Sequence, residues 1–195
     1  MAELKLPVSE EAIRKLTVGD AVELTGRMIT GRDAAHKWLV ESFREKVAPY
    51  LKDTVIYQCG PVVRKNPDGS YDFVAAGPTT SIREEPYEAD VMCRYGLRGV
   101  IGKGGMGPKT SEGLQRCGGV YFHAVGGAAQ VLAHAVKRVE RVFMLEEFGV
   151  PEAMWVIDVE KFPVMVTMDS HGGSLHTEVE AASREKLQEL LGLER

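Results

Sequence analysis

The sequence predicts an α/β fold with a mixed sheet, in which short strands and helices alternate and hairpins occur among them. Short apolar runs such as Thr54–Cys59 are separated by stretches with helical periodicity. The turn residues Asn66–Gly69 lie between two segments with strand character, which is typical of a hairpin. Glycine is dense between Gly96 and Gly127, which indicates turns and close backbone approaches. Because no linker or repeat interrupts the chain, we expect residues 1–195 to form one domain.

The first half of the chain is expected to hold strands, one hairpin and two helices. A turn and a short strand span Val18–Gly26. Asp33 is a natural N-cap for a helix over 34–48, whose apolar residues recur at helical spacing, and Pro49 ends this helix. The later elements are a strand at Thr54–Cys59, hairpin strands at Pro61–Lys65 and Tyr71–Ala76, and a helix from Arg83 toward Arg94.

Glycine-rich turns separate the elements of the second half. Short strands are expected at Gly99–Ile101 and Gly119–Phe122, and helices at Thr110–Arg116 and Ala128–Val136. Three further runs have strand character, namely Val139–Leu145, Met154–Val159 and Val164–Met168. A turn at Ser170–Ser174 closes the last pair of strands, and Thr177–Leu191 is an amphipathic helix.

The composition excludes several classes of protein. The chain has 195 residues, a formal net charge of -4 and a pI near 5.8. This acidic balance argues against a nucleic-acid binder with a basic face and against a polybasic membrane patch. No apolar run approaches the roughly 20 residues of a membrane span, and the N-terminal segment lacks the apolar core of a secretory signal. We therefore expect a cytoplasmic protein without a membrane or nucleic-acid partner.

The three cysteines, Cys59, Cys93 and Cys117, are widely spaced and include no C-x-x-C pair. They predict neither a disulfide framework nor, by themselves, a zinc or iron–sulfur site. His171 and His176 flank a predicted turn and show no metal-ligand spacing. No metal is therefore expected on this chain.

The segment Gly102–Thr110 follows a strand and precedes a helix, which is the setting of a phosphate-binding loop. The template G-x-x-x-x-G-K-[ST] fails because Pro108 lies between Gly107 and Lys109, and proline has no N–H to offer a phosphate. Two other interpretations stay open. The segment is either a tight turn with a solvated lysine, or a loop whose backbone approaches an anion while Lys103 supplies a positive charge.

Three hydroxyls, on Thr79, Thr80 and Ser81, lie in a turn after a buried strand. One or two of them are explained simply as caps of the following helix. Arg83 follows about one helical turn later, and its planar guanidinium matches the geometry of a carboxylate. The segment is therefore also a candidate carboxylate-binding pocket.

Further polar residues lie beside predicted turns. Arg32 precedes a helix N-terminus, where backbone amides favour anions, while His36 is explained equally well by a solvated helix face. His123 ends a strand before a glycine turn, where close strand–helix packing is the simpler explanation. Together, Arg32, Arg83 and Lys103 would place three cations beside hydroxyls, an arrangement that suits a small dianion such as a dicarboxylate.

Four sequence blocks, GRDAAHK, GPTTSIR, IGKGGM and YFHAVGGAA, occur in this order. Together they resemble the C-terminal domain of the class I (iron–sulfur) fumarase and L-tartrate dehydratase family, which in many bacteria and archaea is a separate β subunit. The resemblance extends from about Val18 to Asp169. Four ordered motifs are far more specific than a single glycine loop.

The resemblance implies a swivelling β/β/α three-layer domain with a mixed sheet. It also implies reversible hydration and dehydration of a C4 dicarboxylate, from fumarate to L-malate or from L-tartrate to oxaloacetate. In the family a [4Fe–4S] cluster is held by cysteines of the α portion. This chain would therefore bind no cluster alone, and would act only with an α subunit in an αβ or (αβ)₂ assembly. Cys59, Cys93 and Cys117 are then expected to be ordinary small core residues.

The motifs imply roles for individual residues. Arg32 and Arg83 fall where the family binds substrate carboxylates, and Thr80 is expected to contact substrate as well. Thr79 falls on the proposed catalytic base, and Lys103 on a residue that contacts the substrate close to that base. The residues expected nearby in supporting roles are His36, Gly104 and His123.

A threonine hydroxyl is a poor base unless its alkoxide is strongly favoured, and a close Lys103 acts in that direction. If Lys103 lay far from Thr79, His36 or His123 would be the alternative base.

Glu84 and Trp38 depart from the family pattern. Glu84 and Glu85 follow Arg83 where the family more often has Met and an acidic residue, and Trp38 occupies a position that is often basic. These departures leave the four motif residues unchanged.

A second class of function stays open, namely a non-catalytic regulatory domain that senses a dicarboxylate through the same cations. The Thr79 hydroxyl favours the enzyme, because a sensor has no need of a base. A nucleotide-binding protein is a third interpretation, and Pro108 argues against it.

Overall fold

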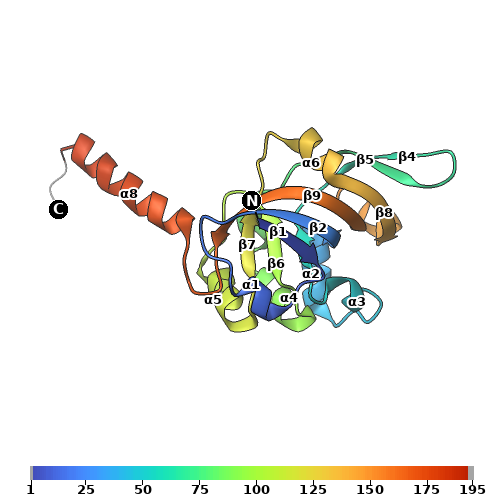
Figure 1. The fold of residues 1–195 in the computed structure, drawn as a ribbon, viewed down its shortest axis with the longest axis horizontal. Coiled ribbons are helices and arrows are strands. Elements are labelled where there is room, and N and C mark those ends of the chain that lie inside the picture. The colour runs from blue at the N-terminus through green and yellow to red at the C-terminus, as the bar shows by residue number, and fades with distance from the viewer. Residues whose placement is uncertain (1, 193–195) are drawn as a thin grey trace.

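The computed structural model describes residues 2–192. Within them, a seven-stranded mixed sheet has the strand order β1-β2-β3-β6-β7-β9-β8, and β4 and β5 form a separate hairpin (Figure 1). The sheet strands are β1 (Ala2–Leu6), β2 (Ala21–Thr30), β3 (Val55–Tyr57), β6 (Gly99–Gly102), β7 (Val120–His123), β8 (Val136–Phe143) and β9 (Met154–Met168). The hairpin strands are β4 (Val62–Lys65) and β5 (Tyr71–Ala75). This arrangement confirms the predicted mixed α/β class.

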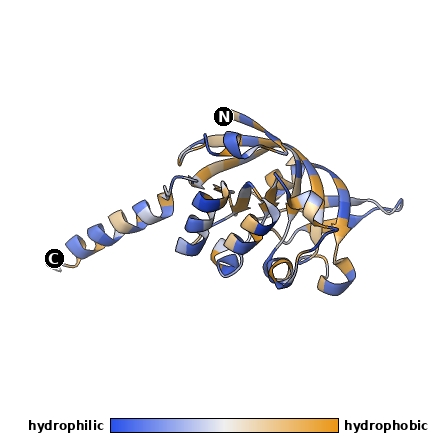
Figure 2. Ribbon diagram, turned by 90° about the horizontal axis from the view of Figure 1, so that it is seen from below, coloured by the Kyte–Doolittle hydropathy of each residue, from blue (hydrophilic) through white to orange (hydrophobic). Residues whose placement is uncertain are grey.

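The helices are α1 (Glu10–Ile13), α2 (Asp33–Glu41), α3 (Ala48–Leu51), the 3₁₀ helix η1 (Ser81–Glu84), α4 (Glu88–Tyr95), α5 (Pro108–Cys117), α6 (Ala129–Ala135), α7 (Leu145–Phe148) and α8 (Leu175–Leu190). Helix α4 contacts both α2 and α5. Helix α8 extends away from the body of the molecule and buries none of its residues (Figures 1 and 2). Within residues 2–192, no helix is long and apolar enough to cross a membrane.

Alternate residues of the central strands pack into two separate hydrophobic clusters. Strands β1, β2, β3, β6 and β7 are parallel neighbours, and β9 runs antiparallel to β2, β7 and β8. One cluster contains Tyr57 and Phe122 together with Trp155 of β9. The other contains Ile56 and Tyr121 together with apolar residues of α2, α4 and α5. Because side chains alternate along a strand, the two clusters lie on opposite faces of the parallel strands.

The helix predicted over 34–48 ends at Glu41. The Arg44 guanidinium donates hydrogen bonds of 3.1 and 2.9 Å to the Trp38 carbonyl, which would otherwise accept from the next helical turn. The backbone N–H of Arg44 donates instead to the Tyr95 hydroxyl, at 2.9 Å. The apolar residues do recur at helical spacing beyond Glu41, but hydrogen bonds to side chains distant in sequence end the helix earlier than this spacing predicts.

Most other predicted elements are present, with shifted ends. The predicted strands Met154–Val159 and Val164–Met168 are one continuous strand, β9, which passes β2 with an irregularity in register. At this point the Lys161 N–H donates to the Thr25 hydroxyl, at 3.1 Å. Strand β1 was not predicted, and it pairs in parallel with β2.

The prediction for the cysteines was wrong at two of three positions. Cys93 of α4 and Cys117 of α5 form a disulfide, with Cα atoms 5.3 Å apart. Gly113 brings the two helices together, because a Cβ there would lie 2.8 Å from the Ala89 Cβ. Cys59 is a free, buried core residue as expected, and burial raises the pKa of its thiol to about 12.

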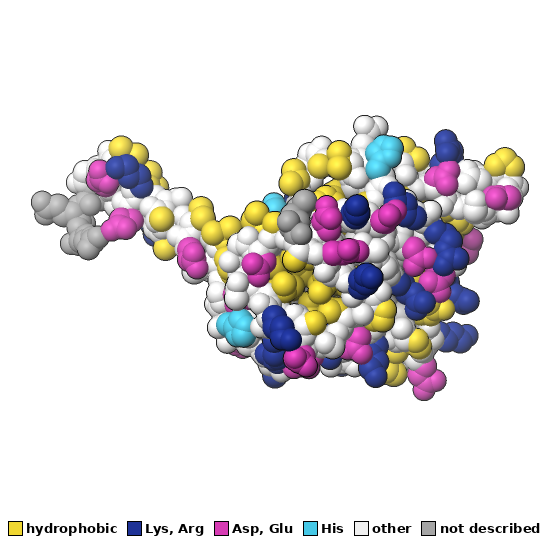
Figure 3. Space-filling model, in the orientation of Figure 1, with side chains coloured by type: hydrophobic (Ala, Val, Ile, Leu, Met, Phe, Trp, Pro, Cys, Tyr) yellow, Lys and Arg dark blue, Asp and Glu magenta, His cyan; other side chains and the backbone are white. Residues whose placement is uncertain are grey.

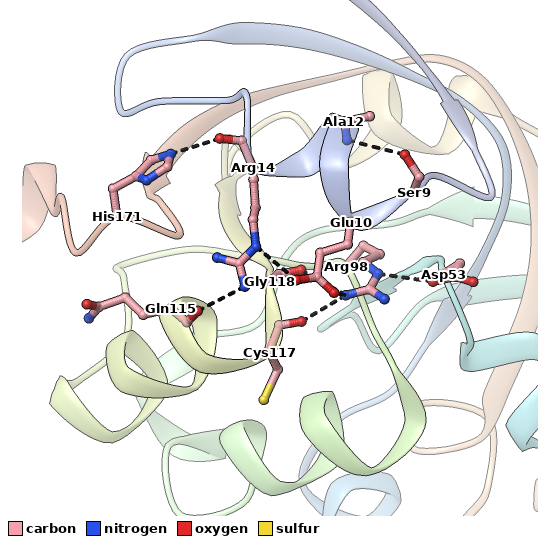
Figure 4. A network of polar contacts seen from close by, with 10 residues as sticks. All are labelled: Ser9, Glu10, Ala12, Arg14, Asp53, Arg98, Gln115, Cys117, Gly118 and His171. Atoms are coloured by element: carbon pink, nitrogen blue, oxygen red, sulfur yellow. Dashed lines mark hydrogen bonds and ion pairs between the residues drawn. The ribbon is translucent and has the colours of Figure 1, made fainter.

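Arg98 ties the N-terminal segment to the end of α5 (Figure 4). Its guanidinium contacts the carboxylates of Asp53 and Glu10, both at 3.0 Å, and donates to the Cys117 carbonyl at 2.8 Å. Glu10 also accepts from Arg14, at 2.9 Å. The Arg98 side chain is only 14% exposed, so its guanidinium makes these contacts largely out of reach of solvent.

The segment 79–81 enters between the ends of β3 and β6. The Thr79 N–H donates to the Gln58 carbonyl (2.6 Å), and the Thr79 carbonyl accepts from the Lys103 N–H (3.2 Å). The Ser81 N–H then donates to the Lys103 carbonyl, at 3.0 Å. Gly102 permits this insertion, because a Cβ there would lie 1.8 Å from Ser81 Oγ and 2.6 Å from Gln58 Oε1.

We expect Arg98→Ala to lower the free energy of unfolding by about 1–3 kcal/mol, because the Cys117 carbonyl and the Asp53 carboxylate lose a donor and Glu10 keeps only Arg14. The control is Arg64→Ala, which removes a pair with Asp72 in which the arginine is 69% exposed. The control should change stability by less than about 1 kcal/mol. Urea unfolding of the full chain measures both, and equally small effects would contradict the role assigned to Arg98.

We expect Gly102→Ala to destabilise the fold by about 2–3 kcal/mol or to prevent folding, because the new methyl group collides with Ser81 and Gln58. Gly127→Ala is the matched control, since a Cβ at Gly127 would meet nothing within 4 Å. Thermal unfolding followed by circular dichroism measures the difference. If Gly102→Ala is as stable as Gly127→Ala, the insertion is looser than described.

Candidate functional site

The residues implied by the sequence motifs lie at one edge of the sheet. Parallel strands β2, β3, β6 and β7 all end there, and ligands of open α/β sheets bind outside such carboxyl ends. Arg32 follows β2, Lys103 follows β6, and His123 is the last residue of β7. Thr79 and Arg83 reach the same edge through the inserted segment 79–81 and the helix η1 that begins there.

Thr79 and Lys103 are neighbours through direct backbone pairing. Besides the hydrogen bond between them, Thr80 and Lys103 form a parallel β-bridge. The Lys103 side chain extends over Gly126, where a Cβ would lie 3.2 Å from Lys103 Cδ and 3.7 Å from Nζ. Among residues 2–192, no carboxylate pairs with Lys103. The glycine turn after β7 thus makes room for the Lys103 ammonium group, while the Lys103 backbone pairs with the two threonines.

Arg32 occupies the N-cap position of α2, which the sequence had assigned to Asp33. Its guanidinium lies against Gly60, where a Cβ would meet Nη1 at 2.4 Å, and 3.4 Å from the Glu152 carboxylate. Glu152 also accepts from the Ala34 N–H in the first turn of α2, at 3.1 Å. Glu152, more than a hundred residues away in sequence, therefore takes the capping role predicted for Asp33.

The Asp33 carboxylate instead forms an ion pair with Arg83. The Arg83 side chain is 51% exposed, so solvent and ligands can reach it. Arg32 and Arg83 therefore both contact carboxylates of this chain, Arg32 that of Glu152 and Arg83 that of Asp33. Of the three predicted cations, only Lys103 has no such partner among the described residues.

A buried chain of polar groups connects the first turn of α2 with Thr79. His36 Nδ1 lies 2.8 Å from the Arg32 carbonyl oxygen, and Nε2 lies 2.8 Å from a Glu88 carboxylate oxygen. Gln58 donates from its amide to Glu88, at 2.8 Å, and its backbone carbonyl accepts from Thr79. This chain holds the backbone of the candidate base on a rigid support.

His36 does not suit the role of alternative base. Its side chain is fully buried, and each ring nitrogen lies 2.8 Å from an oxygen atom, an arrangement that favours the doubly protonated, charged ring. Burial opposes this charge, but the Glu88 carboxylate outweighs the burial and raises the pKa of His36 to about 9. His36 is therefore a structural imidazolium beneath the site.

His123 lies beside a histidine that sequence reasoning did not place in the site, His176 of α8. Their ring centroids are 6.2 Å apart, and His123 Nδ1 is buried without a hydrogen-bond partner. The His176 ring packs on Gly105, where a Cβ would meet it at 2.5 Å, and its Nε2 lies 2.9 Å from the Thr167 hydroxyl. Burial lowers the pKa of both histidines, so both favour the neutral ring. Nothing in the spacing of His176 signals this position.

A hollow of about 720 Å³ lies between the glycine loop and the base of α8. Ile82, Gly104 and His176 are among the residues that line it. Gly104 and Gly105 both have positive φ angles, of 83° and 79°, so the loop turns in a conformation that side chains disfavour. The glycines here shape the loop and admit His176.

The N-terminus of α5 is not a phosphate site. Glu85 accepts from the Gly107 N–H at 2.8 Å and from the Thr110 N–H at 3.2 Å, and the Thr110 hydroxyl donates to it at 2.6 Å. A carboxylate of this chain already occupies the amides that a phosphate would need. The geometry therefore contradicts the nucleotide-loop interpretation.

The described residues do not provide ligands for an iron–sulfur cluster. Such clusters are held by cysteine thiolates, whereas Cys93 and Cys117 are joined to each other and Cys59 is buried with a raised pKa. Residues 2–192 contain no cluster of three or more His, Cys, Asp and Glu side chains with metal-binding geometry.

Comparison with known proteins identifies relatives over most of the chain. A sequence model of the family described as "Fumarase C-terminus" matches residues 1–179. The L(+)-tartrate dehydratase subunit beta of Escherichia coli K12 is 40% identical over 177 residues, which cover 90% of this chain and 86% of that subunit. A Methanocaldococcus jannaschii protein named "Putative L(+)-tartrate dehydratase subunit beta" is 41% identical over 189 residues, which cover 95% of this chain and 96% of that protein.

A longer relative is similar to this chain over only part of its own length. The Geobacillus stearothermophilus protein named "Putative fumarate hydratase class I" is 52% identical over 187 residues, which cover 95% of this chain but only 35% of that protein. The family match and these identities agree with the four ordered motifs. The chain belongs to the fumarase C-terminus family.

Proposed function

We propose that this chain is the β subunit of an iron–sulfur-dependent hydro-lyase that reversibly hydrates or dehydrates a C4 dicarboxylate. Fumarate to L-malate is the favoured reaction, and L-tartrate to oxaloacetate is the related one. The observation that carries this proposal is the backbone pairing of Thr79 with Lys103 at the edge where Arg32 and Arg83 also lie. The names of the relatives at 40–52% identity support the same class of reaction.

Arg32, Arg83 and Lys103 are proposed to bind the two carboxylates of the substrate, with Thr80 as an additional polar contact. Removal of a proton next to a carboxylate places extra negative charge on that carboxylate in the transition state. Fixed cations stabilise this charge more than the ground state, which lowers the barrier. Arg83 and Lys103 supply such cations, because Arg83 is half exposed and Lys103 is unpaired among the described residues.

Thr79 is proposed as the catalytic base, with Lys103 favouring its alkoxide. Two observations support this assignment. The two residues share a backbone hydrogen bond, and His36, one of the alternative bases, is buried as an imidazolium. His123 keeps an unpartnered ring nitrogen beside the site, and we propose a supporting role for it and for Gly104.

The proposed partner is an α subunit that carries the [4Fe–4S] cluster, in an αβ or (αβ)₂ assembly in the cytoplasm. The contrast between the longer class I relative and the short relatives named as beta subunits supports a divided enzyme. Ile82 and Val125, both near the site, are 53% and 64% exposed. Apolar side chains are also exposed along α8 (Figure 3), and exposed apolar surface favours a covering partner.

We also propose that residues 1–195 form one domain of the swivelling β/β/α type. The support is the presence of two hydrophobic clusters, one on each face of the parallel strands, with α2, α4 and α5 over one of them.

The first test is anaerobic co-expression with the neighbouring α-subunit gene, followed by assays with fumarate, L-tartrate and related acids. We expect turnover by the assembled complex and none by the isolated chain at the same substrate concentration. Robust activity of the iron-free chain alone would contradict the subunit assignment. Dicarboxylate binding without turnover in a cluster-loaded complex would favour the regulatory function instead.

Substitutions within the active complex separate the base from a binding residue. Thr79→Ala is expected to lower kcat by about 100-fold or more with a small change in KM, because it removes the proton acceptor. Arg32→Ala is expected to raise KM by about tenfold and to change kcat less. Thr79→Ser, which keeps a hydroxyl, should retain much of the activity. A wild-type kcat in Thr79→Ala would remove Thr79 from the role of base.

A further inference from the structure

Glu84 is a fully buried carboxyl group that none of the proposed roles uses. It ends helix η1 and directly follows Arg83. Within residues 2–192, neither oxygen of Glu84 nor Oδ1 of Asp33 receives a hydrogen bond from an N–H group or a hydroxyl. The two carboxyl groups lie close enough that each shifts the pKa of the other, and their inner oxygens are buried together without a donor.

Two carboxyl groups can share a hydrogen bond only when one of them holds a proton. Arg83 contacts Asp33 directly, which favours the ionised form of Asp33. Burial opposes that charge, but the hydrogen bond from Glu84 and the Arg83 guanidinium lower the pKa of Asp33. Burial and the neighbouring Asp33 raise the pKa of Glu84 to about 8. At neutral pH the proton therefore lies on Glu84, which donates to Asp33.

We propose that Glu84 is a positioning residue whose protonated carboxyl group holds Asp33 against Arg83, and so fixes the direction in which Arg83 meets a substrate carboxylate. The part of this inference that concerns substrate rests on the proposed function. The part that concerns the proton and the order of Arg83 stands on the geometry of this chain alone.

The charged groups around Glu84 balance when it is neutral. On α2 it faces Asp33 and His36, and on α4 it faces Glu88. His36 and Glu88 form their own pair at 2.8 Å, and Arg83 pairs with Asp33. Loss of the Glu84 proton would add one buried negative charge to these two ion pairs, next to Asp33.

The ionised form of Glu84 would weaken substrate binding. It would repel Asp33, compete with the substrate for Arg83, and repel a bound dianion. As the pH rises through about 8, the pKa of Glu84, the proton is lost and KM should increase. Well below pH 8 the proton is held and KM should be constant with respect to this group.

The first measurement uses the full chain without a partner. Carboxyl carbon NMR of labelled chain should show Glu84 titrating near pH 8. The second readout is the order of Arg83, from relaxation of its Nε signal. Glu84→Gln, which keeps a donor toward Asp33, should leave Arg83 as ordered as in the wild type. Glu84→Met, which fills the space without a donor, should make Arg83 markedly more mobile.

The second measurement uses the active complex with its α subunit. Glu84→Met should raise KM for the turned-over dicarboxylate by about five- to tenfold, with a smaller change in kcat, because one charge contact is misdirected. Glu84→Gln should stay within about twofold of wild type at pH 7 and should abolish the rise in KM between about pH 7 and 8.5. If Glu84→Met acted only through a general structural defect, Glu84→Gln would not restore the wild-type KM.

The two proposals fail in different ways. An inactive wild-type complex would contradict the proposed function, while the NMR readouts on the chain alone would still decide the role of Glu84. A Glu84 carboxyl group that titrates at its ordinary pKa, or Arg83 equally ordered in Glu84→Met and in the wild type, would overturn the positioning role.

If Glu84→Met does not fold, Asp33→Asn replaces it. The midpoint of Glu84 should then move to lower pH, and an unchanged midpoint would overturn the pairing.

Discussion

The insertion of the segment 79–81 between the ends of β3 and β6 is the interaction on which the candidate site depends. It makes Thr79 and Lys103 backbone neighbours, so hydrogen bonds of the sheet fix the separation of their backbones. The insertion exists only because Gly102 has no side chain, since a single methyl group would overlap with Ser81 and Gln58. The position of the proposed base is therefore set by hydrogen bonds that the core of the sheet supports from below.

Buried charges beneath this edge are arranged in matched pairs. A lone buried ion is strongly unfavourable, whereas a paired and hydrogen-bonded one is tolerated. His36 and Glu88 neutralise each other, and the Gln58 amide donates to the same Glu88 oxygen that His36 faces, while the Gln58 backbone holds Thr79. Such pairs contribute little net stability compared with a hydrophobic core, so their effect here is mainly geometric. They restrict the site to one arrangement of backbone.

Local sequence patterns predicted where the candidate site residues lie better than they predicted which residues these side chains contact. The sequence placed Thr79 and Lys103 in turns after strands and Arg32 before a helix, and the structure brings these three positions to one edge of the sheet. The N-cap assignment of Asp33 failed because a local capping rule cannot register that Arg83, fifty residues later, takes its carboxylate. The occupation of the α5 N-terminus by Glu85 is likewise a tertiary contact without a sequence signal. Periodicity predicted the class of most elements, but long-range partners set their ends.

The three predicted cations are not equivalent, and this difference shapes how a dianion would enter the site. Arg32 and Arg83 each contact a carboxylate of the chain itself, whereas Lys103 does not among the described residues. An unoccupied cluster of three cations would be costly, because like charges repel at close range. Glu152 and Asp33 therefore act as counter-ions that hold the arginines in place before a ligand arrives. In the proposed function, a substrate carboxylate that engages Arg83 would share it with Asp33, so the strength of the Arg83–Asp33 pair, which we propose Glu84 to support, would set how firmly the substrate is held.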